Sequence, residues 1–344
     1  MFLAVLPLAA LAGSYVATRL LIRFLRLNRI LDRPNARSSH VRPVPRGGGI
    51  AVVAVTLAGW ALALLVAPEL IRPTPGLFAV MTGIAVLSVV SWVDDLHSLK
   101  PAPRLLAQAL AVALGLWAMP GEPMLFQGLL PPGLDLAAAA VLWVWFVNLY
   151  NFMDGIDGLA SSETVVIGVG LALLAQFGGV TPDVGLLGII LAAAALGFLR
   201  WNWQSARIFL GDVGSIPIGY MVGWLLLAAA TQGAWIAALL LPLYFLADAT
   251  LTLLRRLARG ERVWHAHREH FFQRAVRRGT SHAGVVRGVI LCNLVLVGLA
   301  MMATLGPDWI GWVALAGGFA AVGALLLWLG SGHAAAGSDD GPAL

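Results

Sequence analysis

Apolar runs of membrane-spanning length follow one another along almost the whole chain, and they limit its fold more than any other feature. A helix satisfies its own backbone hydrogen bonds in a bilayer and needs about 20 apolar residues to cross it. Runs bounded by charged residues, Pro or Gly lie at residues 2–22, 47–67, 76–93, 103–119, 135–150, 158–177, 184–199, 213–230, 234–254, 284–305 and 309–329. The sequence therefore predicts an all-α polytopic membrane protein with about eleven transmembrane helices.

Composition agrees with membrane burial. Of the 344 residues, 60% are hydrophobic and 11% are charged, whereas about one quarter of a soluble domain is charged. The formal net charge of +5 does not require nucleic acid, because basic residues beside spans fix orientation and meet anionic headgroups. We expect a lipid bilayer as partner and no nucleic acid. The one cysteine, Cys292, is expected to be a packing residue.

Basic residues predict the orientation. If eleven spans alternate in direction, the segments on the inner side are residues 23–46, 94–102, 151–157, 200–212, 255–283 and the tail. Every Lys and Arg except Arg72 lies in these segments or within a few residues of them. The positive-inside rule then puts the N-terminus outside and the C-terminus in the cytoplasm. Residues 1–330 are expected to form one membrane domain, and residues 331–344 a disordered cytoplasmic tail.

Carboxylates and amides gather at the same inner boundary. Asp94 and Asp95 end the third span, where a helix C-terminus disfavours anions and two adjacent carboxylates require a cation or a proton. The fifth span ends in a run with polar residues at three-residue spacing, which share one face if the run is helical: Asn148, Asn151, Asp154 and Asp157. Ionisable residues at this depth are costly and usually functional.

Two further aspartates have two interpretations each. Asp212 lies between glycines at the start of the eighth span, where it is either a metal ligand or only a helix N-cap. Asp248 is the one motif acid well inside a predicted span. It is either a buried partner for an inner cation or part of the rim of the site, and the second interpretation is favoured.

Two inner loops add cations. The last one carries His265, His267, Arg268 and His270. It could be an amphipathic surface helix on anionic lipid or a zinc site, but zinc is disfavoured because no cysteine accompanies it and the aspartates suit Mg²⁺ or Mn²⁺. The first inner loop places Ser39, His40 and Arg46 before a glycine run. These are either topology markers or ligands for phosphate.

Carboxylates for a divalent metal and cations for phosphates are what metal-assisted phosphoryl transfer needs. The chain has no P-loop, so the phosphate donor is expected to be something other than ATP in a usual nucleotide fold.

Four motifs now stand in order: Asp94-Asp95, the Asn-x-x-Asn-x-x-Asp-Gly-Ile-Asp-Gly run, the Phe-x-Gly-Asp-x-Gly-Ser run and the histidine-rich loop. The chain resembles the polyprenyl-phosphate N-acetylhexosamine-1-phosphate transferases of glycosyltransferase family 4, which include the MraY and WecA types. The resemblance implies a Mg²⁺-dependent enzyme of the bacterial inner membrane, with Mn²⁺ as the alternative metal. Its active site would lie on the cytoplasmic face. It would transfer a phospho-N-acetylamino-sugar from a UDP-sugar to undecaprenyl phosphate, release UMP, and initiate O-antigen or another surface glycan.

The resemblance also implies roles for residues. Asp94 would deprotonate or orient the lipid phosphate, with Asp95 in support, and Asp212 and Asn151 would bind Mg²⁺. The polar floor of the site would consist of Asn148, Asn151 and Asp154, uracil would be held by Asp157 and Phe209, and the diphosphate or sugar would be contacted by His265, His267, Arg268 and His270, with Ser39, His40 and Arg46 as further substrate-binding residues.

Two alternatives remain. An MraY-type phospho-MurNAc-pentapeptide transferase would carry three consecutive histidines where this chain reads His-Arg-Glu-His, and that departure, with Arg-Ser-Ser-His in the first loop, favours the WbpL-type branch. A secondary transporter would place its polar site near the bilayer midplane, where only Asp248 is expected. The resemblance leaves open which UDP-sugar is used and whether the chain forms a homodimer.

Overall fold

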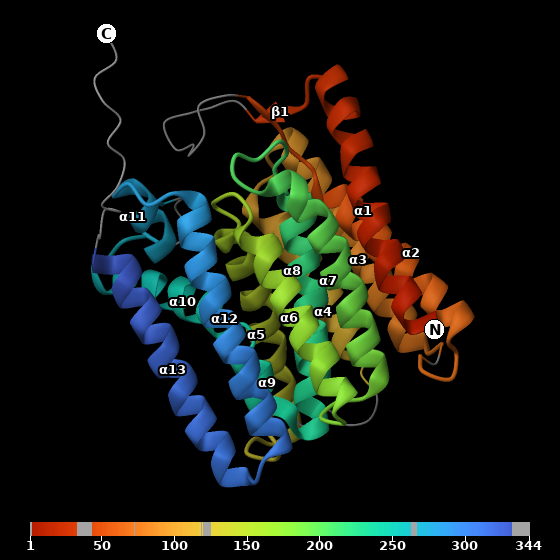
Figure 1. Ribbon diagram of the computed structural model, residues 1–344, viewed down its shortest axis with the longest axis vertical. Coiled ribbons are helices and arrows are strands. Elements are labelled where there is room, and N and C mark those ends of the chain that lie inside the picture. The colour runs from red at the N-terminus through yellow and green to blue at the C-terminus, as the bar shows by residue number, and fades with distance from the viewer. Residues whose placement is uncertain are drawn as a thin grey trace.

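The protein is a bundle of long helices (Figure 1), described by a computed structural model over residues 2–32, 43–71, 73–117, 119, 125–262 and 267–331. The helices are α1 (Phe2–Leu27), α2 (Gly49–Val66), α3 (Pro75–His97), α4 (Pro101–Trp117), α5 (Pro132–Met153), α6 (Leu159–Gln176), α7 (Pro182–Asn202), α8 (Asp212–Ala229), η1 (Ala230–Ala234), α9 (Trp235–Leu240), α10 (Leu243–Ala258), α11 (Phe271–Arg277), α12 (His282–Leu305) and α13 (Asp308–Ser331). Two short strands, β1 (Leu31–Asp32) and β2 (Val44–Pro45), pair antiparallel.

The prediction of a polytopic helical membrane protein is confirmed at this level. Within the described residues, nine helices are long and apolar enough to cross a membrane, with α8, η1 and α9 counted as one continuous stretch. The two helices α4 and α10, of 17 and 16 residues, are shorter than those nine. Each of the eleven apolar runs coincides with helical structure.

The run at residues 234–254 is not one continuous helix. The chain leaves α8 through the π-helical turn η1, in which Gly233 has φ +92°. It then forms the six-residue α9 and restarts as α10 directly after Pro242. Proline lacks the amide hydrogen that an unbroken helix needs, and hydropathy alone does not register such a break.

Helix α8 is the centre of the bundle. Every residue from 213 to 226 is buried, and α8 packs against α2, α3 and α5. Tyr220 of α8 donates a hydrogen bond to the carbonyl of Ala111, and Trp143 Nε1 donates to the carbonyl of Tyr220. The two rings are stacked with centroids 4.7 Å apart. Such interhelical hydrogen bonds and close packing hold helices together where lipid removes the hydrophobic driving force.

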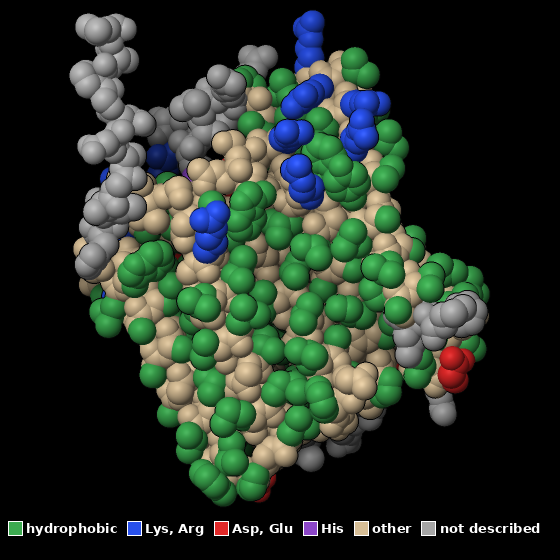
Figure 2. Space-filling view, viewed as in Figure 1, with side chains coloured by type: hydrophobic (Ala, Val, Ile, Leu, Met, Phe, Trp, Pro, Cys, Tyr) green, Lys and Arg blue, Asp and Glu red, His purple; other side chains and the backbone are tan. Residues whose placement is uncertain are grey.

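Basic side chains concentrate at one end of the bundle. Figure 2 shows Lys and Arg over the upper part of the molecule, while hydrophobic side chains cover most of the remaining face. This upper end, here called the basic end, holds the C-terminal ends of α1, α3, α5 and α7 and the N-terminal ends of α2, α4, α6, α8 and α12 (Figure 1). The same end therefore carries both the cations and the polar motifs.

Candidate active site

Arg46 is held at the basic end by its backbone. It forms a parallel bridge with Phe209. The amide of Phe209 donates to the carbonyl of Pro45 at 2.8 Å, and the amides of Gly47 and Gly48 donate to the carbonyl of Phe209 at 3.2 and 2.8 Å. The segment before α2 and the segment before α8 are thereby tied together, which brings the Arg46 side chain beside the start of α8.

Asp95 caps the N-terminus of α8. Its Oδ1 accepts a hydrogen bond from the amide of Asp212 at 3.2 Å, and its Oδ2 accepts from the amide of Val213 at 3.0 Å. The positive end of α8 favours an anion there, which offsets the unfavourable C-terminus of Asp95's own helix. Gly211 permits this approach, since it has φ +77° and a Cβ at that position would lie 2.8 Å from Asp95 Oδ2.

Two arginines connect three carboxylates. Arg46 Nη2 lies 2.8 Å from Asp95 Oδ1 and 3.0 Å from Asp212 Oδ1. Arg104 Nη1 lies 2.9 Å from Asp94 Oδ2, and its Nη2 lies 3.2 Å from Asp212 Oδ2. Asp212 is therefore held between both guanidinium groups, and each arginine joins it to one member of the aspartate pair.

This arginine–carboxylate network is poorly solvated. The side chains of Asp95, Asp94 and Asp212 are 2%, 6% and 16% exposed. Three ionised carboxylates against two guanidinium groups leave one formal negative charge in a confined space. Such a site favours an added cation or a proton, which is the property expected of it from the sequence.

The two asparagines of α5 make different contacts. Asn151 Nδ2 donates to Asp212 Oδ1 at 3.1 Å and to Ser215 Oγ at 2.8 Å. Asn148 Nδ2 donates instead to Gln108 Oε1 on α4 at 2.7 Å. Asn151 thus belongs to the network around Asp212, whereas Asn148 ties α5 to α4 one turn earlier.

The run of four polar residues is helical only in its first half. Helix α5 ends at Met153, so Asp154 and Asp157 lie in the following turn, where Gly158 adopts φ +80°. Asp154 is half-buried. Burial, followed by the negative charge of Asp212, raises the pKa of Asp154 well above its usual range.

Asp157 ties three loops together. Its Oδ2 accepts from the amide of Ala206 at 3.1 Å and lies 3.3 Å from His282 Nδ1. These contacts connect the α5–α6 turn to the α7–α8 loop and to the first residue of α12. The half-buried ring of Phe209 lies in the same α7–α8 loop.

The last loop is anchored on α10. His270 is 2% exposed, and its Nδ1 lies 3.2 Å from Asp248 Oδ1. The ring of His267 lies with its centroid 4.9 Å from that of His270. Burial, with His270 and Arg256 nearby, lowers the pKa of His267 to about 4. Arg268 Nη2 is buried and has no hydrogen-bond partner among the described residues.

This loop reaches the turn after α5. A Cβ at Gly155 would lie 2.8 Å from Phe272 Cζ and 3.3 Å from Gln273 Nε2, so the start of α11 lies directly on the residue after Asp154. The segments before α2 and before α8, the α3–α4 and α5–α6 connections and the last loop therefore meet at the basic end. Three of the site residues expected from the sequence, Ser39, His40 and His265, lie outside the described residues.

Several partners in this site were not expected from the sequence: Arg104, Gln108, Ser215 and His282. Arg104 had one usable signal, since it lies nine residues after Asp95 at the start of the next apolar run. Ser215 ends the Phe-x-Gly-Asp-x-Gly-Ser run, but no role was assigned to it. Gln108 and His282 are ordinary polar residues whose partners lie far away in sequence, so no local pattern singles them out.

The surroundings of Asp212 contain oxygen donors suited to the expected metal, but these donors are not arranged as a full set of metal ligands. Within the described part of the chain, no three His, Cys, Asp or Glu side chains are grouped so that they could hold a metal ion. Both carboxylate oxygens of Asp212 accept hydrogen bonds from arginine, and Asn151 faces Asp212 through its donor nitrogen. The oxygen donors of Asp94 and Asp212 are of the kind that Mg²⁺ prefers.

The fold and the site define a polytopic membrane protein with a charged, half-enclosed site at one end of its helix bundle. Residues 77–230 match the model of glycosyl transferase family 4. A decaprenyl-phosphate N-acetylglucosaminephosphotransferase of Mycolicibacterium smegmatis is 31% identical over 335 residues, which cover 85% of this chain and 79% of that protein. This chain belongs to glycosyl transferase family 4.

Other relatives carry similar names. A probable undecaprenyl-phosphate N-acetylglucosaminyl 1-phosphate transferase of Bacillus subtilis is 28% identical over 276 residues, which cover 77% of this chain and 75% of that protein. An undecaprenyl-phosphate alpha-N-acetylglucosaminyl 1-phosphate transferase of Yersinia pestis is 27% identical over 332 residues, which cover 88% and 84%. The resemblance expected from the motifs is thereby confirmed at the level of the family.

Proposed function

We propose that this protein transfers a phospho-N-acetylamino-sugar from a UDP-sugar to undecaprenyl phosphate and releases UMP. The observation that supports this most is Asp212, held between Arg46 and Arg104 beside the aspartate pair at the basic end. The names of the relatives point to the same reaction class. We further propose the WbpL-type branch, which begins O-antigen or related surface glycans, from the last-loop sequence His-Arg-Glu-His.

The proposed topology follows from charge. We count eleven crossings, in which α4 forms one span and α9 and α10 together form another. This number would place the basic end on one side of the membrane. Lys and Arg favour the cytoplasmic side, so this end would face the cytoplasm of a bacterial cell and the N-terminus would lie outside. UDP-sugars would then reach the site directly.

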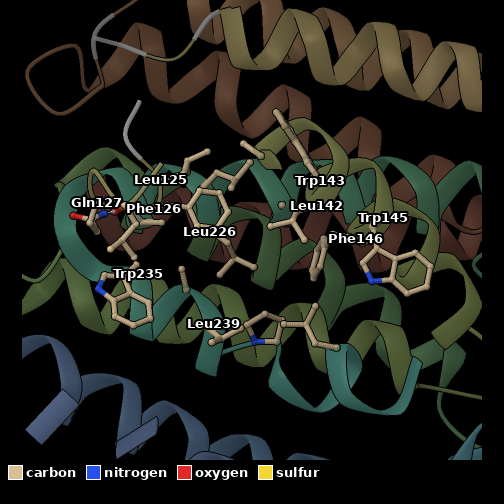
Figure 3. A pocket seen from close by; sticks show the side chains of 18 of the residues that line it. Leu125, Phe126, Gln127, Leu142, Trp143, Trp145, Phe146, Leu226, Trp235 and Leu239 are labelled. Atoms are coloured by element: carbon tan, nitrogen blue, oxygen red, sulfur yellow. Dashed lines mark hydrogen bonds between the residues drawn. The ribbon is translucent and has the colours of Figure 1, made fainter. Parts of the chain in front are cut away.

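An apolar groove provides a place for the lipid chain of the acceptor. Figure 3 shows Trp143, Phe146, Trp235 and Leu239 around a cavity of about 560 Å³ between α5, α8, α9 and α10. Its lining also includes the strongly exposed Leu129 in the connection between α4 and α5. Apolar walls with few polar groups suit an isoprenoid chain.

The groove reaches helix turns close to the site residues of α5 and α10. Phe146 on α5 lies two residues before Asn148, and Leu246 on α10 lies two residues before Asp248. A chain in this groove would place its phosphate near the basic end. The two arginines of the network would then bind phosphate oxygens in place of carboxylates.

In the proposed reaction, an oxygen of the lipid phosphate attacks the phosphorus that carries the sugar. The bond from this phosphorus to the bridging oxygen breaks, and UMP leaves with that oxygen. Asp94 orients the attacking phosphate and accepts its remaining proton when the phosphate is singly ionised. Arg46, Arg104 and the buried guanidinium of Arg268 stabilise charge on the diphosphate.

We propose Mg²⁺ as the resident metal, held by Asp212 and Asn151; Mn²⁺ has the same ligand preference. A bound divalent cation would supply positive charge to offset the negative charge of the transferring phosphoryl group. Asp95 would remain on the α8 amides and keep Asp212 in place.

UMP release by purified protein in proteoliposomes tests the proposal. UMP is expected only when a UDP-N-acetylhexosamine, undecaprenyl phosphate and Mg²⁺ or Mn²⁺ are all present. Release without the lipid, or no release with any UDP-amino sugar, would exclude the transferase. A donor panel that includes UDP-MurNAc-pentapeptide separates the WbpL-type branch from the MraY type, because only the latter accepts the pentapeptide donor. Uptake of solute into vesicles without UMP formation would favour a transporter instead.

A further inference from the structure

Asp248 lies outside the arginine–carboxylate network, yet it has the largest number of donors on one carboxylate in the described residues. Its side chain is fully buried in α10. It accepts hydrogen bonds from five groups: Tyr244 Oη at 3.2 Å, Thr252 Oγ1 at 3.3 Å, His270 Nδ1 at 3.2 Å, the Phe271 amide at 3.0 Å and the Phe272 amide at 3.3 Å. Every lone-pair direction of an ionised carboxylate can be used in this way.

Three of those donors come from the last loop rather than from α10. The amides of Phe271 and Phe272 are the first two of α11, so Asp248 satisfies donors that the helix itself leaves free. The contacts join residues 22 to 24 positions apart. Asp248 is thus the point at which the start of α11 is fixed to α10.

The same carboxylate orients His270. An ionised carboxylate at Nδ1 requires the proton on that nitrogen, which leaves Nε2 as an acceptor. The His270 ring stacks on Phe272, with centroids 5.5 Å apart and planes at 17°, and it lies next to His267. The ring plane and the tautomer are therefore both set from Asp248.

The path continues to the active site. Phe272 and Gln273 lie on Gly155, next to Asp154, whose surroundings include Asp212 and Arg46. A shift of α11 would move residues 267–270 relative to the turn after α5. Packed interiors transmit such shifts because they contain little free space.

We propose that Asp248 is a positioning residue of the transferase site: through His270 and the start of α11 it holds residues 267–270 against the turn at Asp154 and Gly155. This inference rests on the proposed function. Asp248 touches neither substrate nor the reacting atoms, and its effect is expected on use of the UDP-sugar rather than on the lipid.

Asp248→Asn is the direct test. All five contacts are donors, so an amide nitrogen at either oxygen position faces at least two of them. Loss of a group that orients a functional residue typically lowers activity by about 10–100-fold. We expect kcat/KM for the UDP-sugar to fall in that range, with KM for undecaprenyl phosphate within about twofold of wild type.

Two matched variants separate positioning from general stability. Tyr244→Phe removes a hydrogen-bond donor to Asp248 that belongs to α10 rather than to the last loop. Its kcat/KM is expected within about threefold of wild type. Glu163→Gln changes another fully buried acid, which is bonded to Asn293 on α12, and is expected to leave activity unchanged. An equal loss in Tyr244→Phe and Asp248→Asn would overturn the inference.

A double-mutant cycle tests the route through His270. Because Asp248 acts through this histidine as well as through the α11 amides, Asp248→Asn combined with His270→Gln should lose less activity than the product of the two single losses. Multiplying losses, or wild-type kcat/KM in Asp248→Asn, would contradict the inference while the wild-type enzyme still releases UMP. If the wild type itself releases no UMP, the proposed function fails instead.

Phe272→Leu is a second test, for the case that Asp248→Asn does not fold. It leaves the carboxylate and its donors in place but replaces the ring that contacts Gly155 with a shorter side chain. The same selective loss of kcat/KM for the UDP-sugar is expected, and unchanged kinetics in a folded Phe272→Leu protein would overturn the inference.

Discussion

Asp95 lies at the end of α3 but acts as the cap of α8, because its carboxylate accepts a hydrogen bond from the backbone amide of Asp212 at 3.2 Å. The metal-binding candidate and the aspartate pair are thus fixed to each other through a helix terminus rather than through side chains alone. The side chain of Asp212 remains available to Arg46 and Arg104.

Asp212→Asn is expected to remove activity without unfolding the protein. The substitution keeps the shape of the side chain but removes the charge that both arginines share. Loss of one preorganised charge-stabilising group costs about 10²–10³-fold in kcat. UMP release and the melting temperature in detergent are the two measurements. Full activity would mean that Asp212 serves only as the first residue of α8.

Arg104 should not be replaceable by Lys. Its two terminal nitrogens contact different carboxylates, Asp94 and Asp212, and a single ammonium lacks this fork. One lost hydrogen bond between charged groups is worth about 1.5–3 kcal/mol, so Arg104→Lys is expected to lower kcat/KM by about 10–100-fold and Arg104→Gln by more. Lys100→Gln changes an exposed cation directly before α4 and should stay within about twofold.

Gly211→Ala is expected to destabilise the start of α8. The residue has φ +77°, and the added Cβ would lie 2.8 Å from Asp95 Oδ2. Backbone strain alone costs about 1–3 kcal/mol, and displacement of Asp95 adds to it. Gly233→Ala is the control, since its φ is +92° but the Cβ would meet nothing within 4 Å. A Gly211→Ala protein that melts at or above the temperature of Gly233→Ala would contradict this account.

His267 should make the fold less stable in acid. Its pKa is lowered to about 4 from the ordinary value of 6.5, so as pH falls from about 6.5 to 4 the unfolded chain takes up a proton that the folded chain does not. Stability is lost over this window and is unaffected above it, by an amount on the order of 1 kcal/mol for a half-buried group.

Melting temperatures at pH 7.5 and pH 5 measure this effect. His267→Gln is expected to show a smaller drop between the two pH values than wild type. His97→Gln, at an exposed histidine, should behave as wild type. Equal drops in all three proteins would show that His267 does not take up its proton in this window.

The membrane class and the basic end could be predicted because both depend on short stretches of sequence. Apolar runs of spanning length specify helices, whatever their neighbours, since a bilayer leaves the backbone no other way to satisfy its hydrogen bonds. Clustering of Lys and Arg between alternate runs likewise predicted that they would lie at one end of the bundle (Figure 2). The family resemblance also rested on local motifs.

Local periodicity was a weaker guide where the backbone breaks. Asn148 and Asn151 do share helix α5, but Asp154 and Asp157 follow its end, because the glycines of that run allow a turn that spacing alone does not reveal. Likewise, the apolar run after Gly233 is divided before Leu243.

Only the tertiary structure decided which polar groups meet. Arg46 and Asp212 are 166 positions apart, and Arg104 and Asp212 are 108 apart. Asp248, whose role the sequence left open between two interpretations, proved to be the anchor of His270. The physical reason is that helices which are apolar on every side carry no pattern that says which face meets which neighbour. That choice depends on the packing of the whole bundle, and the partners of each carboxylate follow from it.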